Sequence, residues 1–168
     1  MLVRPARPED AAAVAEVHVR TWRAAYEHVF GAERLATLDL AQRRARWQER
    51  LAAPSPDWHV FVAEHDDGSV AGFAVAGESR DSSGEGELYS IYVLPDAWGS
   101  GAGSGLIRAA IESLRGLGFH TATLWVLEDN PRARRFYERE GWAADGGRRE
   151  TEHLGVHTGE VRYRITFD

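Results

Sequence analysis

Residues 87–107 combine an alternating apolar segment, a glycine-rich loop and the start of an amphipathic helix. The segment Glu87-Leu-Tyr-Ser-Ile-Tyr-Val-Leu alternates as a β-strand does, and Pro95 follows it directly. Glycine then occupies every second position from Gly99 to Gly105. Because these glycines have no side chain, a ligand can approach the backbone N–H groups there. The sequence therefore predicts a strand, an open loop and a helix N-terminus in direct succession.

A helix N-terminus behind such a loop suits a phosphate group. Its first N–H groups have no partner within the helix, and the positive end of the helix dipole lies there. The spacing of the glycines does not fit the dinucleotide fingerprint G-x-G-x-x-G. The chain also contains no lysine, which excludes the Walker loop and the protein-kinase strand lysine. The loop either binds another pyrophosphate-bearing ligand or only tightens a strand-to-helix connection.

About thirty residues further on, a second strand leads into a short helix that carries a tyrosine. Asn130 and Pro131 form the pattern of an N-cap followed by the first helical residue. Gly141 is typical of a helix stop. Phe136 and Tyr137 fall on one face of this helix. We therefore expect a short helix between the proline and the glycine.

Together, residues 87–142 resemble the GNAT superfamily of N-acetyltransferases, which use acetyl-CoA. The first segment resembles the family's acetyl-CoA motif, a strand followed by Arg/Gln-x-x-Gly-x-Gly/Ala and a helix. The second resembles the companion motif Asn-x-x-Ala-x-x-Phe-Tyr-x-x-x-Gly-Phe/Trp. One position departs, because Trp98 stands where the family usually has Arg or Gln, so a side-chain contact to the pyrophosphate is expected to be missing. The backbone cradle at 99–104 depends on glycine and is expected to remain.

The resemblance implies a set of site residues. Tyr137 is the expected general acid, since a phenol with a pKa near 10 is protonated at neutral pH and can donate to the leaving sulfur. Glu87 is the expected base, acting through an ordered water. Structural roles stay open for both, as a core aromatic and as an edge carboxylate. The expected coenzyme-binding residues are Ile91, Tyr92, Val93, Gly99, Ser100, Gly101, Ala102, Gly103, Ser104 and Asn130.

The whole chain of 168 residues, 43% of them hydrophobic, is long enough for one domain with its own core. We expect a single GNAT-like domain over residues 1–168. Its fold class is α/β (α+β), with a mixed, mostly antiparallel central sheet of about seven strands and helices on both faces. One helical region is expected over 33–52, ended by Pro54 and Pro56. Asp66-Asp67-Gly68 predicts a β-hairpin turn.

Charge and composition limit the partners. The net charge of −6 disfavours nucleic acid and weakly favours cationic partners such as amines. No apolar run reaches the roughly 20 residues of a membrane span, so no membrane partner is expected and the cytoplasm is the default location. The absence of cysteine excludes thiolate sites. His153 and His157 have H-x₃-H spacing without an evident third ligand, so no metal is expected.

The acceptor is less determined than the coenzyme. By resemblance, the first helix and the loop before the motif strand line the acceptor cleft, which points to Trp22, Tyr26, Glu78 and residues 79–86. The resemblance implies transfer of an acetyl group from acetyl-CoA to a primary amine of a small molecule or peptide, by direct attack in a ternary complex. The alternative is a non-catalytic acyl-CoA-binding sensor or regulatory domain. A homodimer is implied by the resemblance alone.

The basic residues of the tyrosine helix form a local exception to the acidic balance. Arg132, Arg134, Arg135 and Arg139 lie within eight positions of one another. They are either a solvated helix face, with Glu138 paired to Arg134, or a surface on which Arg139 meets the CoA nucleotide. The sequence alone leaves both interpretations open.

Overall fold

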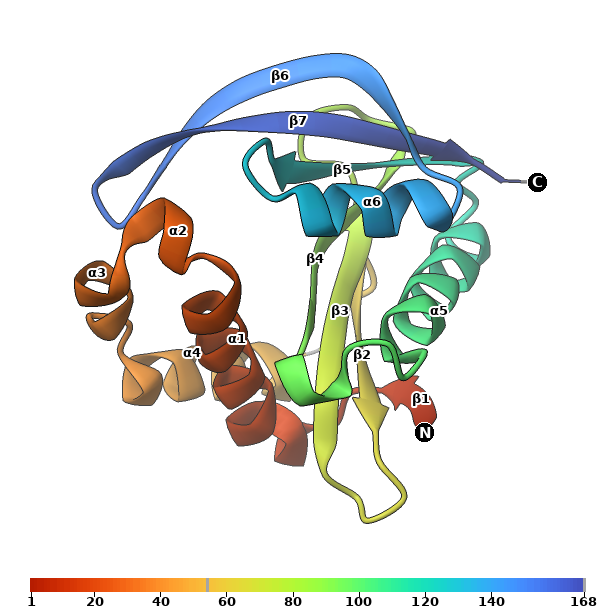
Figure 1. Ribbon diagram of the computed structural model, residues 1–168. Coiled ribbons are helices and arrows are strands. Elements are labelled where there is room, and N and C mark those ends of the chain that lie inside the picture. The colour runs from red at the N-terminus through yellow and green to blue at the C-terminus, as the bar shows by residue number, and fades with distance from the viewer. Residues whose placement is uncertain (54, 168) are drawn as a thin grey trace.

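A seven-stranded sheet forms the centre of the molecule (Figure 1). The computed structural model describes residues 1–53 and 55–167, so Pro54, which was expected to end a helix, lies outside the described residues. The strand order is β1-β2-β3-β4-β5-β7-β6, and all neighbours are antiparallel except β4 and β5. The predicted mixed, mostly antiparallel sheet is therefore confirmed. The strands are β1 (Leu2–Pro5), β2 (Trp58–Glu64), β3 (Val70–Glu78), β4 (Gly86–Val93), β5 (Thr121–Leu127), β6 (Ala143–His153) and β7 (Val156–Thr166).

Helices cover both faces of this sheet, as predicted. Helices α1 and α4 bury Val14 and Trp47 against Phe73 of β3, whereas α5 and α6 bury Leu106 and Tyr137 against the opposite face. Each core consists of apolar side chains that folding removes from water. The α-helices are α1 (Ala11–Ala25), α2 (Glu27–Phe30), α3 (Ala32–Ala36), α4 (Leu40–Ala52), α5 (Ala102–Gly116) and α6 (Pro131–Arg139), with short 3₁₀ turns at Pro8–Asp10 and Pro95–Ala97.

The two parallel strands separate soon after they pair. Only Gly86 and Glu87 of β4 are in register with β5, opposite Ala122 and Thr123. Beyond these pairs β4 turns along β3, while β5 continues along β7. The strands therefore open a V-shaped gap in the sheet, and the ends of α1, α5 and α6 surround it (Figure 1). This gap positions the functional site.

The helical region expected over 33–52 is wrong in one respect, because two helices occupy it. The chain leaves helical geometry before Asp39, and the Asp39 carboxylate accepts a hydrogen bond from the backbone N–H of Gln42 at 3.0 Å. That side chain caps α4 and so begins a new helix within the predicted one. Helix α6, by contrast, begins at Pro131 and ends at Arg139, as its cap residues predict.

The C-terminal hairpin of β6 and β7 is long. Its strands run over eleven residues each and meet at a turn in which Leu154 and Gly155 have positive φ. The turn packs against α1 and α2, since Leu154 and Val156 join the cluster around Phe30. The hairpin therefore closes one side of the gap (Figure 1). None of the helices in the described part of the chain is long and apolar enough to cross a membrane.

Candidate functional site

A cavity of about 1030 Å³ fills the gap between β4 and β5. It has two ends, which differ in the elements that form them. We call the first the loop end, where the glycine loop meets α6, and the second the hairpin end, where β6 and β7 meet α1. The loop end is lined by Trp98, Gly99, Gly101, Gly103, Ser104, Arg132, Arg135, Phe136 and Arg139. The hairpin end is lined by Trp22, Tyr26, Trp125, Arg149, His153 and Glu160.

The glycine loop opens its backbone to the cavity. Gly99 and Gly101 have φ of 78° and 90°, values that favour glycine because a Cβ would strain them. Helix α5 starts directly after Gly101 and has no side-chain cap at that residue. The N–H groups of its first turn and the positive end of its dipole therefore meet the cavity, where an anion would be stabilised.

Two residues predicted to bind the coenzyme shape the loop instead of lining the cavity. The Ser100 hydroxyl donates to the carbonyl of Ala97 at 2.7 Å and accepts from the N–H of Ala102 at 3.3 Å. The Ala102 side chain is buried in the core beneath the loop. The other predicted contacts line the cavity, namely Ile91, Tyr92, Val93, Gly99, Gly101, Gly103, Ser104 and Asn130.

The two sequence motifs touch each other at Gly103. A Cβ built on this glycine would lie 2.9 Å from Cζ of Phe136, so the ring occupies the space that a side chain would fill. The next residue adds a polar contact, because the Ser104 hydroxyl donates to the Glu140 carboxylate at 2.5 Å. These contacts hold the start of α5 against α6.

Strand β4 bends where it reaches the cavity. Its register with β3 shifts between Ser90 and Leu88, which leaves Tyr89 as an extra residue. After this bulge, Ile91, Tyr92 and Val93 all line the cavity. The peptide groups of this part of β4 are therefore beside the cavity.

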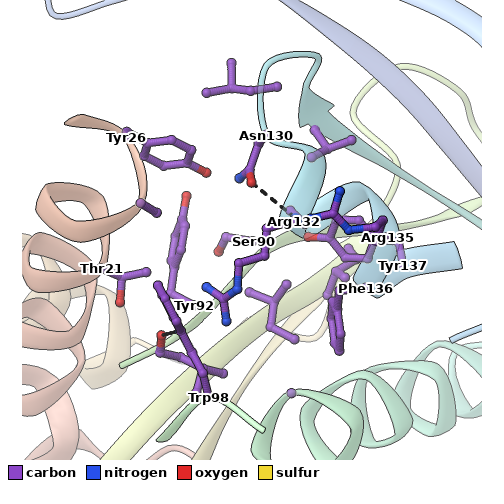
Figure 2. Close-up of a pocket in the computed structure, with 18 of the residues that line it drawn as sticks. Thr21, Tyr26, Ser90, Tyr92, Trp98, Asn130, Arg132, Arg135, Phe136 and Tyr137 are labelled. Atoms are coloured by element: carbon purple, nitrogen blue, oxygen red, sulfur yellow. Dashed lines mark hydrogen bonds between the residues drawn. The ribbon is translucent and has the colours of Figure 1, made fainter. Parts of the chain in front are cut away.

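Helix α6 brings Asn130 and Tyr137 into the cavity (Figure 2). The Asn130 side chain accepts a hydrogen bond from the N–H of Ala133 at 3.1 Å and so caps the helix. Tyr137 is 8% exposed, and burial raises the pKa of its phenol well above the usual value. The hydroxyl is therefore protonated over the whole physiological range and can donate a proton.

Glu87 is buried beside the cavity and is not part of its lining. It is 1% exposed, and its carboxylate accepts hydrogen bonds from Arg80, from the backbone N–H at 2.9 Å and from the guanidinium at 2.5 Å. Arg80 does line the cavity, with its guanidinium 4.7 Å from the ring centre of Tyr89. Glu87 therefore reaches the cavity through Arg80 in this structure.

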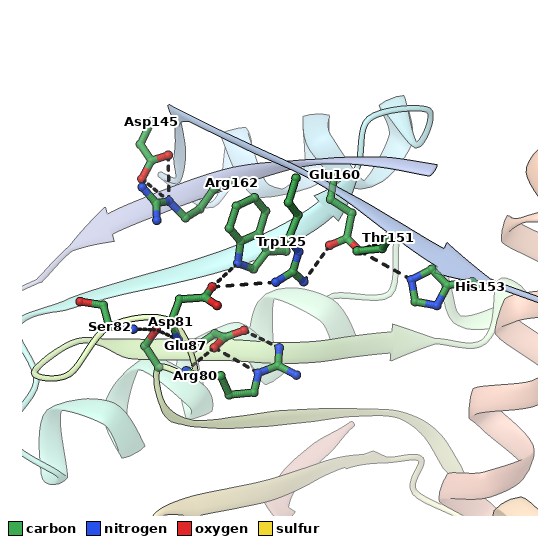
Figure 3. A network of polar contacts seen from close by, with 12 residues as sticks. Arg80, Asp81, Ser82, Glu87, Trp125, Asp145, Thr151, His153, Glu160 and Arg162 are labelled. Carbon is green, nitrogen blue, oxygen red and sulfur yellow. Dashed lines mark hydrogen bonds and ion pairs between the residues drawn. The ribbon is translucent and has the colours of Figure 1, made fainter. Parts of the chain in front are cut away.

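Glu160 is the buried carboxylate of the hairpin end (Figure 3). It accepts hydrogen bonds from Arg149 at 3.1 Å and from Thr151 at 3.0 Å, and His153 lies 3.6 Å away. The same network continues to Asp81, which accepts from the indole of Trp125 on β5 at 2.7 Å and lies 3.9 Å from the guanidinium of Arg149 on β6. These contacts attach the loop before β4 to β5 and to the hairpin.

Only some of the residues at the hairpin end were predicted from the sequence. Trp22 and Tyr26 line the cavity as expected, whereas Glu78 is exposed and lies outside the lining. Glu160 and Arg149 were not predicted. The sequence indicates only that each residue lies on a strand, where successive side chains point to opposite faces. That signal does not show which strands will be neighbours.

The histidines with metal-like spacing take separate partners. His157 lies 3.4 Å from Glu152 on the exposed face of the hairpin, while His153 faces Glu160. Within residues 1–53 and 55–167, no group of three or more His, Asp or Glu side chains is arranged to hold a metal ion. These two histidines therefore do not share one site.

Comparison with known proteins agrees with this geometry. Residues 14–142 match the model of the Acetyltransferase (GNAT) family. An uncharacterized N-acetyltransferase of Bacillus subtilis (strain 168), YuaI, is 37% identical over 131 residues, which cover 77% of this chain and 73% of that protein. The chain therefore belongs to the GNAT acetyltransferase family, and its class of activity is acyl transfer.

Solved structures share the fold over nearly the whole chain. The PaiA N-acetyltransferase of Thermoplasma acidophilum, in complex with coenzyme A, superposes with a TM-score of 0.79 at 16% identity, covering 99% of this chain and 98% of that one. A structure of yncA from Salmonella typhimurium with its cofactor acetyl-CoA gives a TM-score of 0.73 at 23% identity, covering 100% and 94%. At these identities the likeness concerns the fold alone.

Proposed function

We propose that the protein, as one domain, transfers an acetyl group from acetyl-CoA to a primary amine of a small molecule or peptide within a ternary complex. One observation carries this proposal. A single cavity joins the helix N-terminus behind a glycine loop to a buried, protonated phenol. The first feature suits a diphosphate and the second suits a leaving sulfur, and a coenzyme A thioester has both groups.

The residues present suit the separate parts of acetyl-CoA. The first-turn N–H groups of α5 would hold the diphosphate, and Asn130 and the peptide groups of β4 would hold the pantetheine chain. When bound, acetyl-CoA supplies the thioester carbon that the amine attacks and the sulfur that leaves. The N–H groups of β4 are fixed dipoles, so they stabilise the negative charge that develops on the carbonyl oxygen.

Tyr137 is the proposed general acid. As the amine nitrogen bonds to the acetyl carbon and the carbon–sulfur bond breaks, the phenol donates its proton to the sulfur. Tyr137 suits this role because it lines the cavity and because burial, which raises its pKa, keeps the phenol protonated at neutral pH. A tyrosine with only a structural role in the core would not need to line the cavity.

The proton acceptor has two candidates. Glu87 stays a predicted base, and in this structure a bridging water would have to pass Arg80 to reach it. Glu160 is the second candidate, and the geometry favours it because its carboxylate lines the cavity beside His153. A lysine-like amine has a pKa of about 10.4, so keeping it neutral at pH 7 costs roughly 4–5 kcal/mol, and the reaction therefore benefits from a base that accepts the proton.

The aromatic side chains of the hairpin end suit the acceptor. Trp22 and Tyr26 meet edge to face with ring centres 5.0 Å apart, and Trp22 also lies 5.6 Å from His153. Aromatic faces attract an ammonium group before it loses its proton. Glu160 lines the same end of the cavity, where Arg149 balances its charge, so a compact primary amine is the proposed acceptor.

Release of coenzyme A across a panel of primary amines tests the function. We expect turnover with at least one amine, and we expect Tyr137→Phe to lower kcat about 10- to 1000-fold while the Kd for acetyl-CoA stays within about threefold. Tyr163→Phe is the matched control, since that phenol bonds Glu138 and Arg134 in the core. Binding of acetyl-CoA without turnover on any amine would support the sensor alternative instead.

A further inference from the structure

Trp98 is a large apolar side chain that stays 38% exposed beside the glycine loop. Its indole N–H donates to the carbonyl of Val93 at 2.7 Å, which fixes the ring at the end of β4. The ring lines the loop end of the cavity (Figure 2). A tryptophan that is exposed and held in one orientation beside the cavity indicates that another group stacks on the face of its ring.

That partner in this structure is Arg132. Its guanidinium carbon lies 3.0 Å from the centre of the Trp98 ring, so the charged plane covers the indole face. Arg132 is the second residue of α6 and also lines the loop end. A guanidinium on an indole keeps its charge and its N–H donors available at its edge. Stacking on Trp98 therefore does not occupy the five N–H donors of Arg132, which lie beside the glycine loop.

Arg132 lacks a counter-ion in the part of the chain that the structure describes. Partial burial and the nearby Arg139 lower its pKa, and no carboxylate acts to raise it. Arg135 and Arg139 follow at helical spacings on the same face of α6 and line the cavity as well. Arg134 shows the contrast, because its guanidinium turns away and bonds the Tyr163 hydroxyl and the Glu128 carbonyl.

The glycine loop has no cation of its own. Between Leu94 and Ser104 the residues are apolar or small, apart from Asp96, which is acidic and lies near Arg20. Backbone N–H groups alone would have to balance a doubly charged diphosphate there. An unpaired guanidinium from α6 would supply the missing charge.

We infer that Trp98 and Arg132 form a two-part clamp for the diphosphate of coenzyme A, in which Arg132 binds the phosphates and Trp98 positions Arg132. This inference rests on the proposed function, because it takes coenzyme A as the ligand. Arg132 is a binding residue in this scheme. Trp98 acts through Arg132, so its contribution depends on the arginine being present.

Calorimetry with three ligands tests the clamp. Coenzyme A contains the diphosphate, dephospho-coenzyme A keeps the diphosphate but lacks the 3′-phosphate, and pantetheine is the thiol arm without phosphates or adenosine. We expect Arg132→Gln to weaken binding of coenzyme A and of dephospho-coenzyme A about 10- to 100-fold and to leave pantetheine binding unchanged. Weaker binding of coenzyme A alone would assign Arg132 to the 3′-phosphate and refute the clamp. Arg132→Lys, which keeps the charge without the planar fork, is expected to recover part of the affinity. Arg108→Gln, an exposed position on α5, controls for the change in net charge.

Trp98 is tested by its coupling to Arg132. Trp98→Leu is expected to weaken coenzyme A binding about 3- to 10-fold in the wild-type background. In the Arg132→Gln background the same change should have no further effect, because the guanidinium that Trp98 positions is absent. Trp98→Phe keeps an aromatic face and is expected to bind coenzyme A more tightly than Trp98→Leu.

Each result has a clear meaning. If wild-type protein binds coenzyme A and Arg132→Gln binds it equally well, or loses pantetheine to the same extent, the clamp is refuted while the proposed function stands. Additive effects of the two substitutions would refute the positioning role of Trp98. If the wild-type protein binds no coenzyme A at millimolar concentration, the proposed function fails and the clamp fails with it.

Discussion

The two ends of the cavity are built in different ways. At the loop end, the part that suits a phosphate consists of the backbone of neighbouring residues, since Gly99, Gly101 and the start of α5 follow one another in the chain. The hairpin end consists of side chains from distant segments, with Trp22 on α1 and Glu160 on β7. A site made of consecutive backbone groups is recognisable from sequence. A site made of side chains from several elements exists only after the strands have paired.

The charges at the two ends differ as well. At the hairpin end Arg149 pairs with Glu160, and Arg80 pairs with Glu87. At the loop end Arg132 is stacked on an indole and has no carboxylate acting on it among the described residues. The loop end therefore needs an anionic ligand to balance it, whereas the hairpin end is already balanced and can take a small amine.

Glu160→Gln is expected to have the largest effect of the substitutions that distinguish the two ends. It should impair the hairpin end and leave the loop end unchanged. If Glu160 receives the proton of the amine, kcat/KM falls about 100-fold or more and the acidic limb of the pH–rate profile disappears. The Kd for acetyl-CoA should not change, because Glu160 lies at the other end of the cavity. Steady-state rates from pH 5.5 to 9 give the profile, and calorimetry gives the Kd.

Glu87→Gln and Glu152→Gln accompany that experiment. Glu152 is exposed on the same hairpin and pairs with His157, so its substitution controls for charge without touching the cavity. Loss of the acidic limb in Glu87→Gln, with a normal profile in Glu160→Gln, would assign the base to Glu87 and reject the preference for Glu160.

Gly103→Ala tests the loop end at its contact with α6. The new methyl group would meet Phe136 at 2.9 Å, so either the ring or the start of α5 must move. We expect the free energy of unfolding to fall by about 1–2 kcal/mol and the Kd for acetyl-CoA to rise several-fold, with the amine KM unchanged. Urea unfolding and calorimetry measure the two quantities.

Gly116→Ala is the matched control on the same helix. No atom lies within 4 Å of a Cβ built there, and its φ is not positive. This substitution should stabilise the protein by roughly 0.5–1 kcal/mol, because alanine loses less backbone entropy in a helix. Equal effects of the two substitutions would mean that the contact with Phe136 has no importance.

Sequence patterns predicted the local features of the fold well. Asn130, Pro131 and Gly141 determine the limits of α6 through backbone geometry that involves only adjacent residues. The glycine loop is similar, because positive φ is a property of single residues. Asp39 shows the limit of this approach, since its capping bond divides a region whose apolar pattern looks continuous.

The hairpin end could not be predicted for a physical reason. Glu160 faces the cavity because β7 pairs with β5 in one register, and a shift by one residue would turn its side chain to the other face. The pairing of Arg80 with Glu87 likewise depends on how the loop after β3 folds back. Such arrangements follow from long-range packing rather than from local sequence.

The last expected effect concerns stability and α1, behind the hairpin end. The His18 ring stacks on Tyr92 at 5.0 Å and lies near Phe73, and its Nδ1 is buried without a hydrogen-bond partner in the described structure. Burial, together with Arg43 and Arg50 of α4, lowers the pKa of His18 to about 3. The folded protein therefore keeps this imidazole neutral at a pH where the unfolded chain, with a pKa near 6.5, takes up a proton.

The sign of the pH dependence follows from that difference in proton uptake. Stability from His18 is complete above about pH 6.5 and is lost as the pH falls toward 3, by about 1.4 kcal/mol for each pH unit. Urea unfolding at pH 7.5 and pH 5.5 should therefore differ by about 1.4 kcal/mol more in the wild type than in His18→Phe, which cannot titrate. An equal change in both proteins would show that His18 binds protons in the folded state. In that case water reaches α1 beneath Tyr92, and the hairpin end is more open than its packing indicates.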